Sequence, residues 1–492
     1  MRFIGHHMTD LGGNGPYIGA CRSAWPRIAM AMLLLAHPAA ADIEITPNAT
    51  VQALATDNLR KAATDPEGDA ILQSVAGIQI TGETQRLRFL GTGSLLYTAF
   101  AENSSLNRLS GNMLSNAQIT VIPDFLYVDG NAQISDEFLD IADQSATGLP
   151  NGGAQNRIFN YSLGSYIKTE ILDVADAMLR GQYSAVQTDP LDGTSSLVSL
   201  GDSLAFQASF LITNGERSRM AVWRLSGNMS KEERENDETF ESANTQASLK
   251  LRVTPRVHVV GRVGYEQISG STIDDINGEI WGAGLVYEIG DDSRLTVEWG
   301  HQFGRESWSG ELDVKMSESL ALRGAYSERL ESQQARLGRT LGDLFDQSSS
   351  LPNAPLPDPI TPGQNLVDDV FYVKDATFDI IYSKLDRSLT VGGRLSQRNF
   401  TSTNGNDETA GVAAKYSEVL LRDVFLDLLG SYDGTIDTLP GQTPTDRFTG
   451  SSVLSYRLGE RSTAQFQYTW SRTTNVDEVT ENVVGAGFSH TF

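Results

Sequence analysis

Residues 464–471 read AQFQYTWS, an unbroken alternation of apolar and polar side chains. Successive side chains of an extended strand point to opposite faces, so this stretch has one apolar face and one polar face. A soluble β-sandwich also contains such strands, and one strand therefore does not decide the fold. The polar face carries Gln and Thr, which suits contact with water better than packing in a dry core.

The same alternation recurs along the chain, for example at 87–97, 257–266 and 295–303. In these stretches the polar face carries mainly Arg, Glu, Gln, Thr and Ser. We predict that such side chains face a wet interior. The candidate lumen-lining residues are Arg86, Arg88, Arg256, His258, Arg262, Glu266, Glu298, Gln465 and Gln467.

Strands cross lipid only as a closed cylinder, because every backbone N–H and C=O group must be paired there within the protein. The sequence signature is repeated segments of about ten residues, apolar outward and polar inward, separated by turns. We therefore predict an all-β protein, a transmembrane antiparallel up-and-down β-barrel in the cell outer membrane. Tyrosines near strand ends fit an aromatic girdle at the membrane interfaces, namely Tyr97, Tyr265, Tyr326 and Tyr468.

Connection lengths support the barrel independently. Short turns, such as 253–255, 290–291 and 385–386, alternate with longer polar connections, such as 58–69, 134–156 and 187–201. Outer-membrane barrels have short periplasmic turns and longer outer loops, so both termini are expected in the periplasm and the strand number is even. We predict about 22 strands, within two, including strands at 106–117 and 119–133.

The first 41 residues are expected to be a signal peptide. Arg22 and Arg27 precede a short apolar core, and the small residues 39–41 form a cleavage site before Asp42. Residues 1–20 are polar and Gly-rich, which suggests a start codon assigned too early. Cleavage also removes Cys21, the only cysteine, so a disulfide is not expected. Residues 42–492 would then form a single barrel domain.

The last strand carries a further signal. Phe488, His490 and Phe492 fall on one face, and Phe492 is the final residue. A terminal aromatic residue on an amphipathic last strand resembles the signal that outer-membrane assembly machinery recognises in its substrates. The expected partners are thus outer-membrane lipid and that machinery.

Net charge and hydropathy argue against two other classes of protein, namely nucleic-acid-binding proteins and bundles of transmembrane helices. The formal charge of −24 argues against nucleic-acid binding, which favours clustered Lys and Arg. No apolar run after residue 41 approaches the roughly 20 residues that a transmembrane helix needs.

We find no pattern that predicts catalysis. His490 falls on the lipid-facing side and His301 near the girdle, while His258 points inward and is expected to be a solvated lumen residue. No nucleophile elbow, zinc-protease motif or phosphate loop occurs. The pairs Asp274-Asp275, Asp291-Asp292 and Asp368-Asp369 are expected to be solvated loop charges. We predict no enzyme activity, cofactor or metal.

Three short patterns resemble the outer-membrane barrel family associated with PEP-CTERM/exosortase systems. Residues 46–58, with Thr46-Pro47, Val51-Gln52-Ala53-Leu54 and Thr56-Asp57-Asn58, resemble its opening strand. Residues 77–82 and 86–97 resemble its next hairpin, and Tyr326-Ser327-Glu328 is similar to a later feature. The resemblance implies a setting in exopolysaccharide biosynthesis and export, with exopolysaccharide or its export machinery as partner. It supplies no catalytic residues.

The longest predicted outer loop, 333–370, contains five prolines. Loops of this length are usually functional or disordered, and this one is expected to constrict the lumen or cover the outer mouth. Three functions stay open. One is a channel or secretion-associated pore linked to exopolysaccharide export, the second is a non-conducting structural barrel that anchors surface polymer, and the remote third is an outer-membrane hydrolase.

Overall fold

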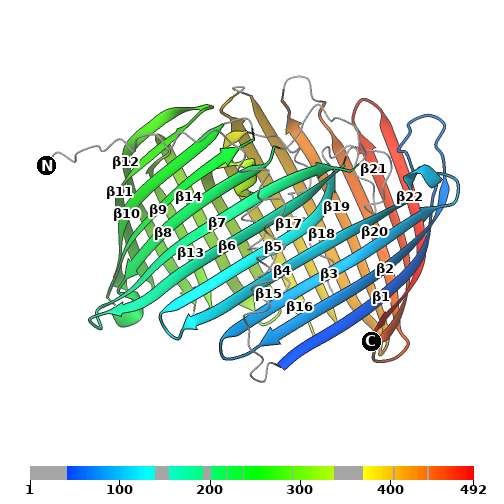
Figure 1. Cartoon of the computed structure of the whole chain (residues 1–492), viewed down its shortest axis with the longest axis horizontal. Coiled ribbons are helices and arrows are strands. Elements are labelled where there is room, and N and C mark those ends of the chain that lie inside the picture. Colours follow the sequence, from blue (N-terminus) through cyan, green and yellow to red (C-terminus); the bar gives the residue numbers. More distant parts are fainter. Residues whose placement is uncertain are drawn as a thin grey trace. The chain divides into compact units, whose positions relative to one another are not determined.

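Figure 1 shows a computed structural model of the chain, in which tilted strands close into a barrel. The structure describes residues 42–138, 155–191, 201–218, 220–235, 238–290, 292–336, 369–402, 405–439 and 443–492. The predicted signal peptide and residues 337–368 of the longest loop lie outside the described residues. Within the described residues, no helix has the length and apolarity needed to cross a membrane.

The barrel has 22 antiparallel strands, which confirms the predicted number. In chain order they are β1 (Asp42–Thr56), β2 (Asp69–Glu83), β3 (Leu87–Phe100), β4 (Arg108–Ile122), β5 (Leu126–Phe138), β6 (Gln155–Ile171), β7 (Ala175–Pro190), β8 (Ser203–Thr213), β9 (Ala221–Arg234), β10 (Thr239–Thr254), β11 (Val257–Gly270), β12 (Ile273–Gly290), β13 (Ser293–Gln302), β14 (Arg305–Ser317), β15 (Leu320–Ser332), β16 (Val370–Lys384), β17 (Arg387–Phe400), β18 (Asn406–Leu421), β19 (Val424–Asp437), β20 (Asp446–Arg457), β21 (Ser462–Thr474) and β22 (Glu478–Thr491). Two short 3-10 turns, η1 (Ser104–Leu106) and η3 (Gly215–Arg217), lie between strands.

Each strand pairs with the next along the chain, and the first strand pairs with the last. The β1–β22 register runs from Asn48 opposite Thr491 to Thr56 opposite Val483. This pairing leaves the sheet without a free edge, as strands in lipid require. Phe492 follows the last strand, and its backbone N–H donates to the carbonyl of Pro47.

The longer connections lie at one end of the barrel, the predicted outer end. That end also has the two-residue turn Phe303-Gly304 between β13 and β14, with positive φ at both residues, as such hairpin turns require. The other end carries short turns, among them Leu172-Asp173-Val174 between β6 and β7, in which Leu172 and Asp173 have positive φ. Pro123-Asp124-Phe125 forms another tight turn, between β4 and β5. The predicted boundary at residue 118 was therefore wrong, because residues 118–122 continue the β4 alternation up to the proline.

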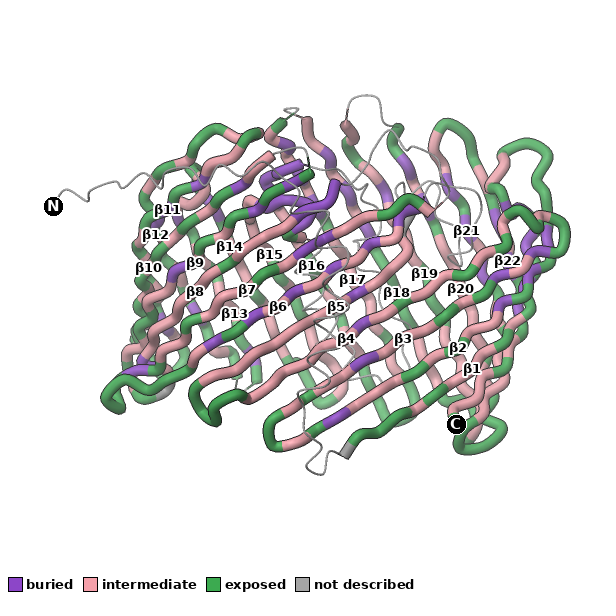
Figure 2. Tube along the Cα trace, in the orientation of Figure 1, coloured by how far each residue is buried: buried purple, intermediate pink, exposed green. Residues whose placement is uncertain are grey.

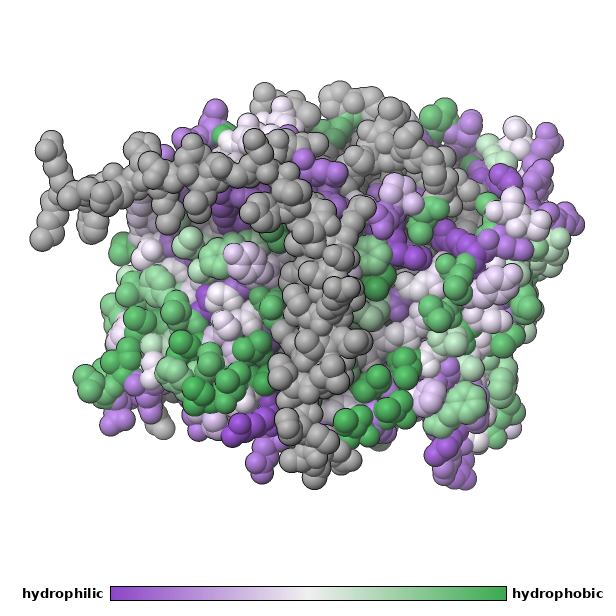
Figure 3. Space-filling view, viewed as in Figure 1, coloured by the Kyte–Doolittle hydropathy of each residue, from purple (hydrophilic) through white to green (hydrophobic). Residues whose placement is uncertain are grey.

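The two faces of the wall differ as predicted. Along β10, Leu249 and Leu251 are exposed on one face, whereas Gln246, Ser248 and Lys250 alternate with them. Figure 2 shows this interleaving along the strands, and Figure 3 shows hydrophobic side chains on the described outer wall between more hydrophilic ends. Asp274-Asp275, predicted to be loop charges, lie instead within β12.

The short-turn end also carries a charge cluster. Arg217 of η3 hydrogen-bonds Asp176 and Glu170, which lie at the adjacent ends of β7 and β6. The Asp176 carboxylate, followed by that of Glu170, raises the pKa of the Arg217 guanidinium. Turn and strand ends are thus held together at the predicted periplasmic rim.

Candidate functional site in the barrel lumen

Three of the predicted lumen-lining arginines lie at the periplasmic rim. Arg86 and Arg256 lie in the short turns that precede β3 and β11, and not on the wall. Arg88 follows on β3, where its Nε lies 3.1 Å from Glu83 Oε1 and both side chains are well exposed. The prediction placed Arg86 and Arg256 on the strands, whereas β3 starts at Leu87 and β11 at Val257, because alternation alone does not mark where a strand begins.

Four other predicted residues lie on the inner face of β11 and β13. His258 Nε2 lies 2.9 Å from Glu288 Oε1, and Arg262 Nε lies 3.9 Å from Glu298 Oε2. The first contact joins the neighbouring strands β11 and β12, and the second joins β11 to β13 across β12. His258 is buried, so it is not the solvated lumen residue that was predicted.

The last strands carry the remaining predicted residues. On β21, Gln465 and Gln467 lie on the inner face, and the exposed Phe466 between them lies on the other face. The side-chain amide of Gln465 donates to Gln52 of β1 at 3.3 Å. On β22, Phe488 is exposed on the lipid-facing side. His490 lies on the same face, where its Nδ1 is 2.8 Å from Ser462 Oγ and its ring packs edge-on against Phe492.

The outer end of the lumen is crossed by the β15–β16 hairpin. Pairing between β14 and β15 ends at Gly310 opposite Tyr326, whereas β15 and β16 remain paired up to Ser332 opposite Val370. The upper part of the hairpin therefore has no neighbour on its β14 side. We call residues 327–336 and 369–375 the mouth segment.

The mouth segment reaches strands that are separated from β15 in the wall by β12, β13 and β14. Ser332 Oγ donates to Glu232 Oε2 of β9 at 2.5 Å. Val370 packs in one cluster with Phe240 of β10 and Ile268 of β11, and all three are buried. Polar and apolar contacts thus fix the same end of the hairpin to β9–β11.

These contacts are made to the inner face of β9–β11. The exposed apolar side chains of the same strands occupy the alternate positions, for example Met229, Leu249 and Val263. The mouth segment consequently spans part of the lumen. Figure 2 shows buried positions gathered at the upper end of the barrel, above the β15 and β16 labels.

The β13–β14 turn also folds onto the inner wall. The buried carboxylate of Glu266 accepts hydrogen bonds from the backbone N–H groups of Phe303 and Gly304. Two successive N–H groups with positive φ form a concave anion-binding nest. Glu266, predicted to line open lumen, is instead buried under this turn. Arg305, next along the chain, lies 4.1 Å from the ring centroid of Tyr372 in the mouth segment.

The other side of the mouth segment packs around a buried ion pair. Arg398 of β17 bonds to Asp407 of β18, with its Nε 2.9 Å from Oδ1. Its Nη1 donates to Gln333, in the helical turn that follows β15. The Arg398 guanidinium also lies 5.3 and 5.2 Å from the ring centroids of Phe371 and Phe400.

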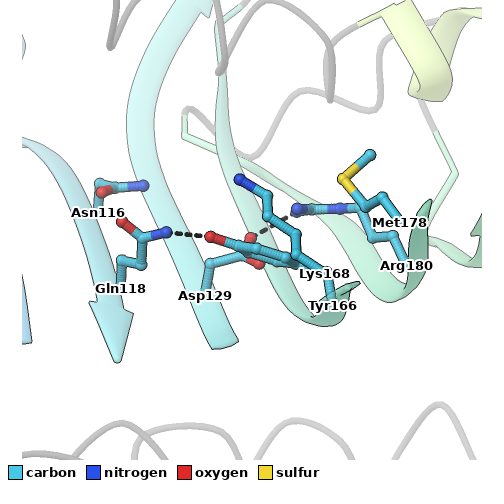
Figure 4. Close-up of a pocket in the computed structure, with 7 residues that line it drawn as sticks. All are labelled: Asn116, Gln118, Asp129, Tyr166, Lys168, Met178 and Arg180. Atoms are coloured by element: carbon cyan, nitrogen blue, oxygen red, sulfur yellow. Dashed lines mark hydrogen bonds and ion pairs between the residues drawn. The ribbon is translucent and has the colours of Figure 1, made fainter. Parts of the chain in front are cut away.

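A hollow of about 360 Å³ lies lower on the inner wall, nearer the periplasmic end. Four neighbouring strands, β4 to β7, supply its lining (Figure 4). The lining residues are Asn116, Gln118, Asp129, Tyr166, Lys168, Met178 and Arg180.

The ring of Tyr166 lines this hollow and stacks on a second tyrosine outside the lining. Tyr127 and Tyr166 stack with centroids 4.8 Å apart and an interplanar angle of 11°. Gln118 hydrogen-bonds the Tyr166 hydroxyl, and Tyr166 is buried. The exposed Lys168 Nζ lies 5.8 and 5.2 Å from the two centroids, within cation–π range.

An ion pair closes the opposite side. Arg180 Nη2 lies 2.5 Å from Asp129 Oδ2. Gly164 lies between them, and a Cβ there would be 3.2 Å from both the guanidinium and the carboxylate. Asp129 Oδ1 is buried and has no hydrogen-bond donor among the described residues.

The hollow was not predicted from the sequence, although a signal was present. Phe159, Tyr161 and Leu163 alternate along β6, and continuation of that pattern places Tyr166 and Lys168 on the polar face. An aromatic residue on a polar face marks a departure from simple barrel alternation.

Among the described residues, no three His, Cys, Asp or Glu side chains are arranged to hold a metal ion. The three histidines of the barrel lie on different strands, one on the inner face and two on the lipid-facing side. The described residues therefore bring no histidine into the hollow.

Comparison with known proteins supports the fold. No family model and no curated protein matches the chain. Among solved structures, the FrpB iron transporter from Neisseria meningitidis (F5-1 variant) is similar with a TM-score of 0.51 and 8% identity, over 91% of this chain and 82% of that one. The siderophore receptor PirA from Pseudomonas aeruginosa gives 0.48 and 9%, over 91% and 80%. This likeness concerns the fold, and with the closed strand topology it places the chain in the cell outer membrane as a β-barrel.

Proposed function

We propose that the barrel is a passage for hydrophilic molecules across the outer membrane, and that it serves exopolysaccharide export. The observation that carries this proposal is the width of the barrel combined with its polar inner face. Barrels of 16 to 18 strands already leave a water channel, and 22 strands enclose more than inward side chains fill. The assignment to exopolysaccharide rests on the resemblance of residues 46–58, 77–97 and 326–328 to the exosortase-associated barrels.

The mouth segment supplies the gate in this proposal. Its hydrogen bond to Glu232 and its apolar contacts with Phe240 and Ile268 hold it across the outer end. Passage of a polymer then requires these contacts to open. These contacts are separate from the strand pairing that closes the barrel, so they can open without disturbing it.

Single-channel conductance of the refolded protein in a planar bilayer tests the proposal. The comparison is the full chain against a variant in which residues 336–366 are replaced by a short Gly-Ser linker. We expect a small conductance for the full chain and a larger one for the variant, with unchanged heat-modifiable migration on gels. Two well-folded barrels that both fail to conduct would contradict a passage.

The second candidate is a structural barrel that anchors surface polymer. The buried Arg398–Asp407 pair and the nest around Glu266 favour it, because both make the outer end a packed structure. Polymer retained on intact cells by a non-conducting barrel, and lost when the protein is absent, would select this function.

A further inference from the structure

We propose that the hollow on β4–β7 is a binding station for anionic saccharides, that is, for sugar units that carry a carboxylate. The inference deepens the proposed passage and rests on it for the direction of transport. The hollow is part of the barrel wall, so ligand binding to it can be measured separately from transport.

The charge of the hollow selects an anion. Lys168 and Arg180 contribute two positive charges, and Asp129 contributes one negative charge. Arg180 is paired with Asp129, whereas Lys168 is exposed and contacts aromatic rings, with no ion pair to a described carboxylate. A local excess of positive charge in a chain of net charge −24 attracts an anionic group to one place on the wall.

The remaining lining suits a sugar ring. Saccharides offer C–H faces that pack on apolar surface and hydroxyl groups that exchange hydrogen bonds with amides and carboxylates. Met178 and the ring of Tyr166 supply the first kind of surface, while the amides of Asn116 and Gln118 supply the second. The unsatisfied Asp129 Oδ1 is an acceptor for a ligand hydroxyl once the side chain turns toward the lumen.

The position of the hollow suits an early contact during export. Its residues lie toward the short-turn ends of β4–β7, whereas the mouth segment lies at the other end of the lumen. A polymer entering from the periplasm therefore meets the hollow before it reaches the gate.

The test measures binding of three probes to the refolded full-length barrel by calorimetry. The probes are trigalacturonate (an anionic saccharide), maltotriose (a neutral saccharide) and citrate (an anion without a sugar ring). We expect trigalacturonate to bind more tightly than either control. Lys168→Met should weaken trigalacturonate binding about tenfold, because it removes one charge-assisted contact with the ligand carboxylate.

The matched control is Lys250→Met, which removes a lysine from the inner face of β10, outside the hollow. We expect less than a twofold change for this variant. An unchanged affinity in Lys168→Met, an equal loss in Lys250→Met, or equal binding of all three probes would overturn the station. If the wild type binds as expected but passes no current, the passage fails and the station stands; if it conducts but Lys168→Met binds normally, the station fails and the passage stands.

Discussion

Two of the Arg–Asp pairs in the lumen differ mainly in their burial. Arg398–Asp407 at the outer mouth has side chains 1% and 5% exposed, whereas Arg180–Asp129 in the hollow has side chains 29% and 12% exposed. The mouth pair lies between two aromatic rings and a glutamine of the mouth segment. The same pair of residue types therefore joins structural elements at one site and lines an accessible wall at the other.

This difference predicts unequal costs of substitution. Removing one partner of a buried ion pair leaves an uncompensated charge and costs about 3–5 kcal/mol, whereas an accessible pair is worth about 1 kcal/mol or less. We expect Arg398→Ala to lower the free energy of unfolding by the larger amount and Arg180→Ala by the smaller. Urea titration of the refolded barrels, followed by heat-modifiable migration, measures both.

The double variant Arg398→Ala/Asp407→Ala controls for the orphaned charge. It should recover part of the stability lost in Arg398→Ala, since no buried carboxylate then remains without a partner. Equal losses for Arg398→Ala and Arg180→Ala would mean that mouth and wall do not differ in the way that burial indicates.

A second prediction tests whether both regions lie inside the lumen. Phe466 is exposed on the lipid-facing side of β21, and Gln467 is its inward neighbour. A charge at the bilayer midplane on the lipid-facing side costs about 2–4 kcal/mol, while lumen substitutions cost little. We expect Phe466→Arg to destabilise the barrel by that amount and Gln467→Arg to remain close to the wild type in the same titration. Similar losses would contradict the assignment of faces on which the comparison depends.

The wall was largely predictable because its physical cause is local. Lipid on one side and water on the other impose a period of two, so residues such as Phe466 and Gln467 reveal their faces directly. The strand number followed from the same periodicity. Turn positions were less certain, and the Pro123-Asp124-Phe125 turn was missed because alternation alone does not mark where pairing stops.

The mouth was not predictable, because its packing depends on distant strands. By alternation, Leu330 and Val370 belong to the lipid-facing side of β15 and β16, yet both pack with the inner residue Phe240. The reversal arises because β15 pairs with β14 only up to Tyr326, so the hairpin bends into the lumen with its outer face against β10 and β11. Glu328 was the available signal, since a carboxylate at a lipid-facing position indicates that the strand has left the membrane.

The last prediction has the smallest expected effect and addresses the mouth contact itself. Ser332→Ala removes the hydroxyl that donates to Glu232, and with it the acceptor for the backbone N–H of Ala335 in the following helical turn. Loss of one such hydrogen bond costs about 1 kcal/mol, which shifts a two-state equilibrium about fivefold. Global stability should hardly change, because strand pairing still closes the barrel. Open events in single-channel recordings should instead become about five times as frequent relative to closed ones.

Ser248→Ala, on the inner face of β10 and outside the contact, is the matched control and should leave the recordings unchanged. If Ser332→Ala behaves like Ser248→Ala while the variant lacking residues 336–366 conducts more, residues 336–366 restrict the current and the Ser332–Glu232 hydrogen bond does not. If neither variant changes the current, the mouth segment is a fixed part of the wall, and the contrast with the hollow is one of packing alone.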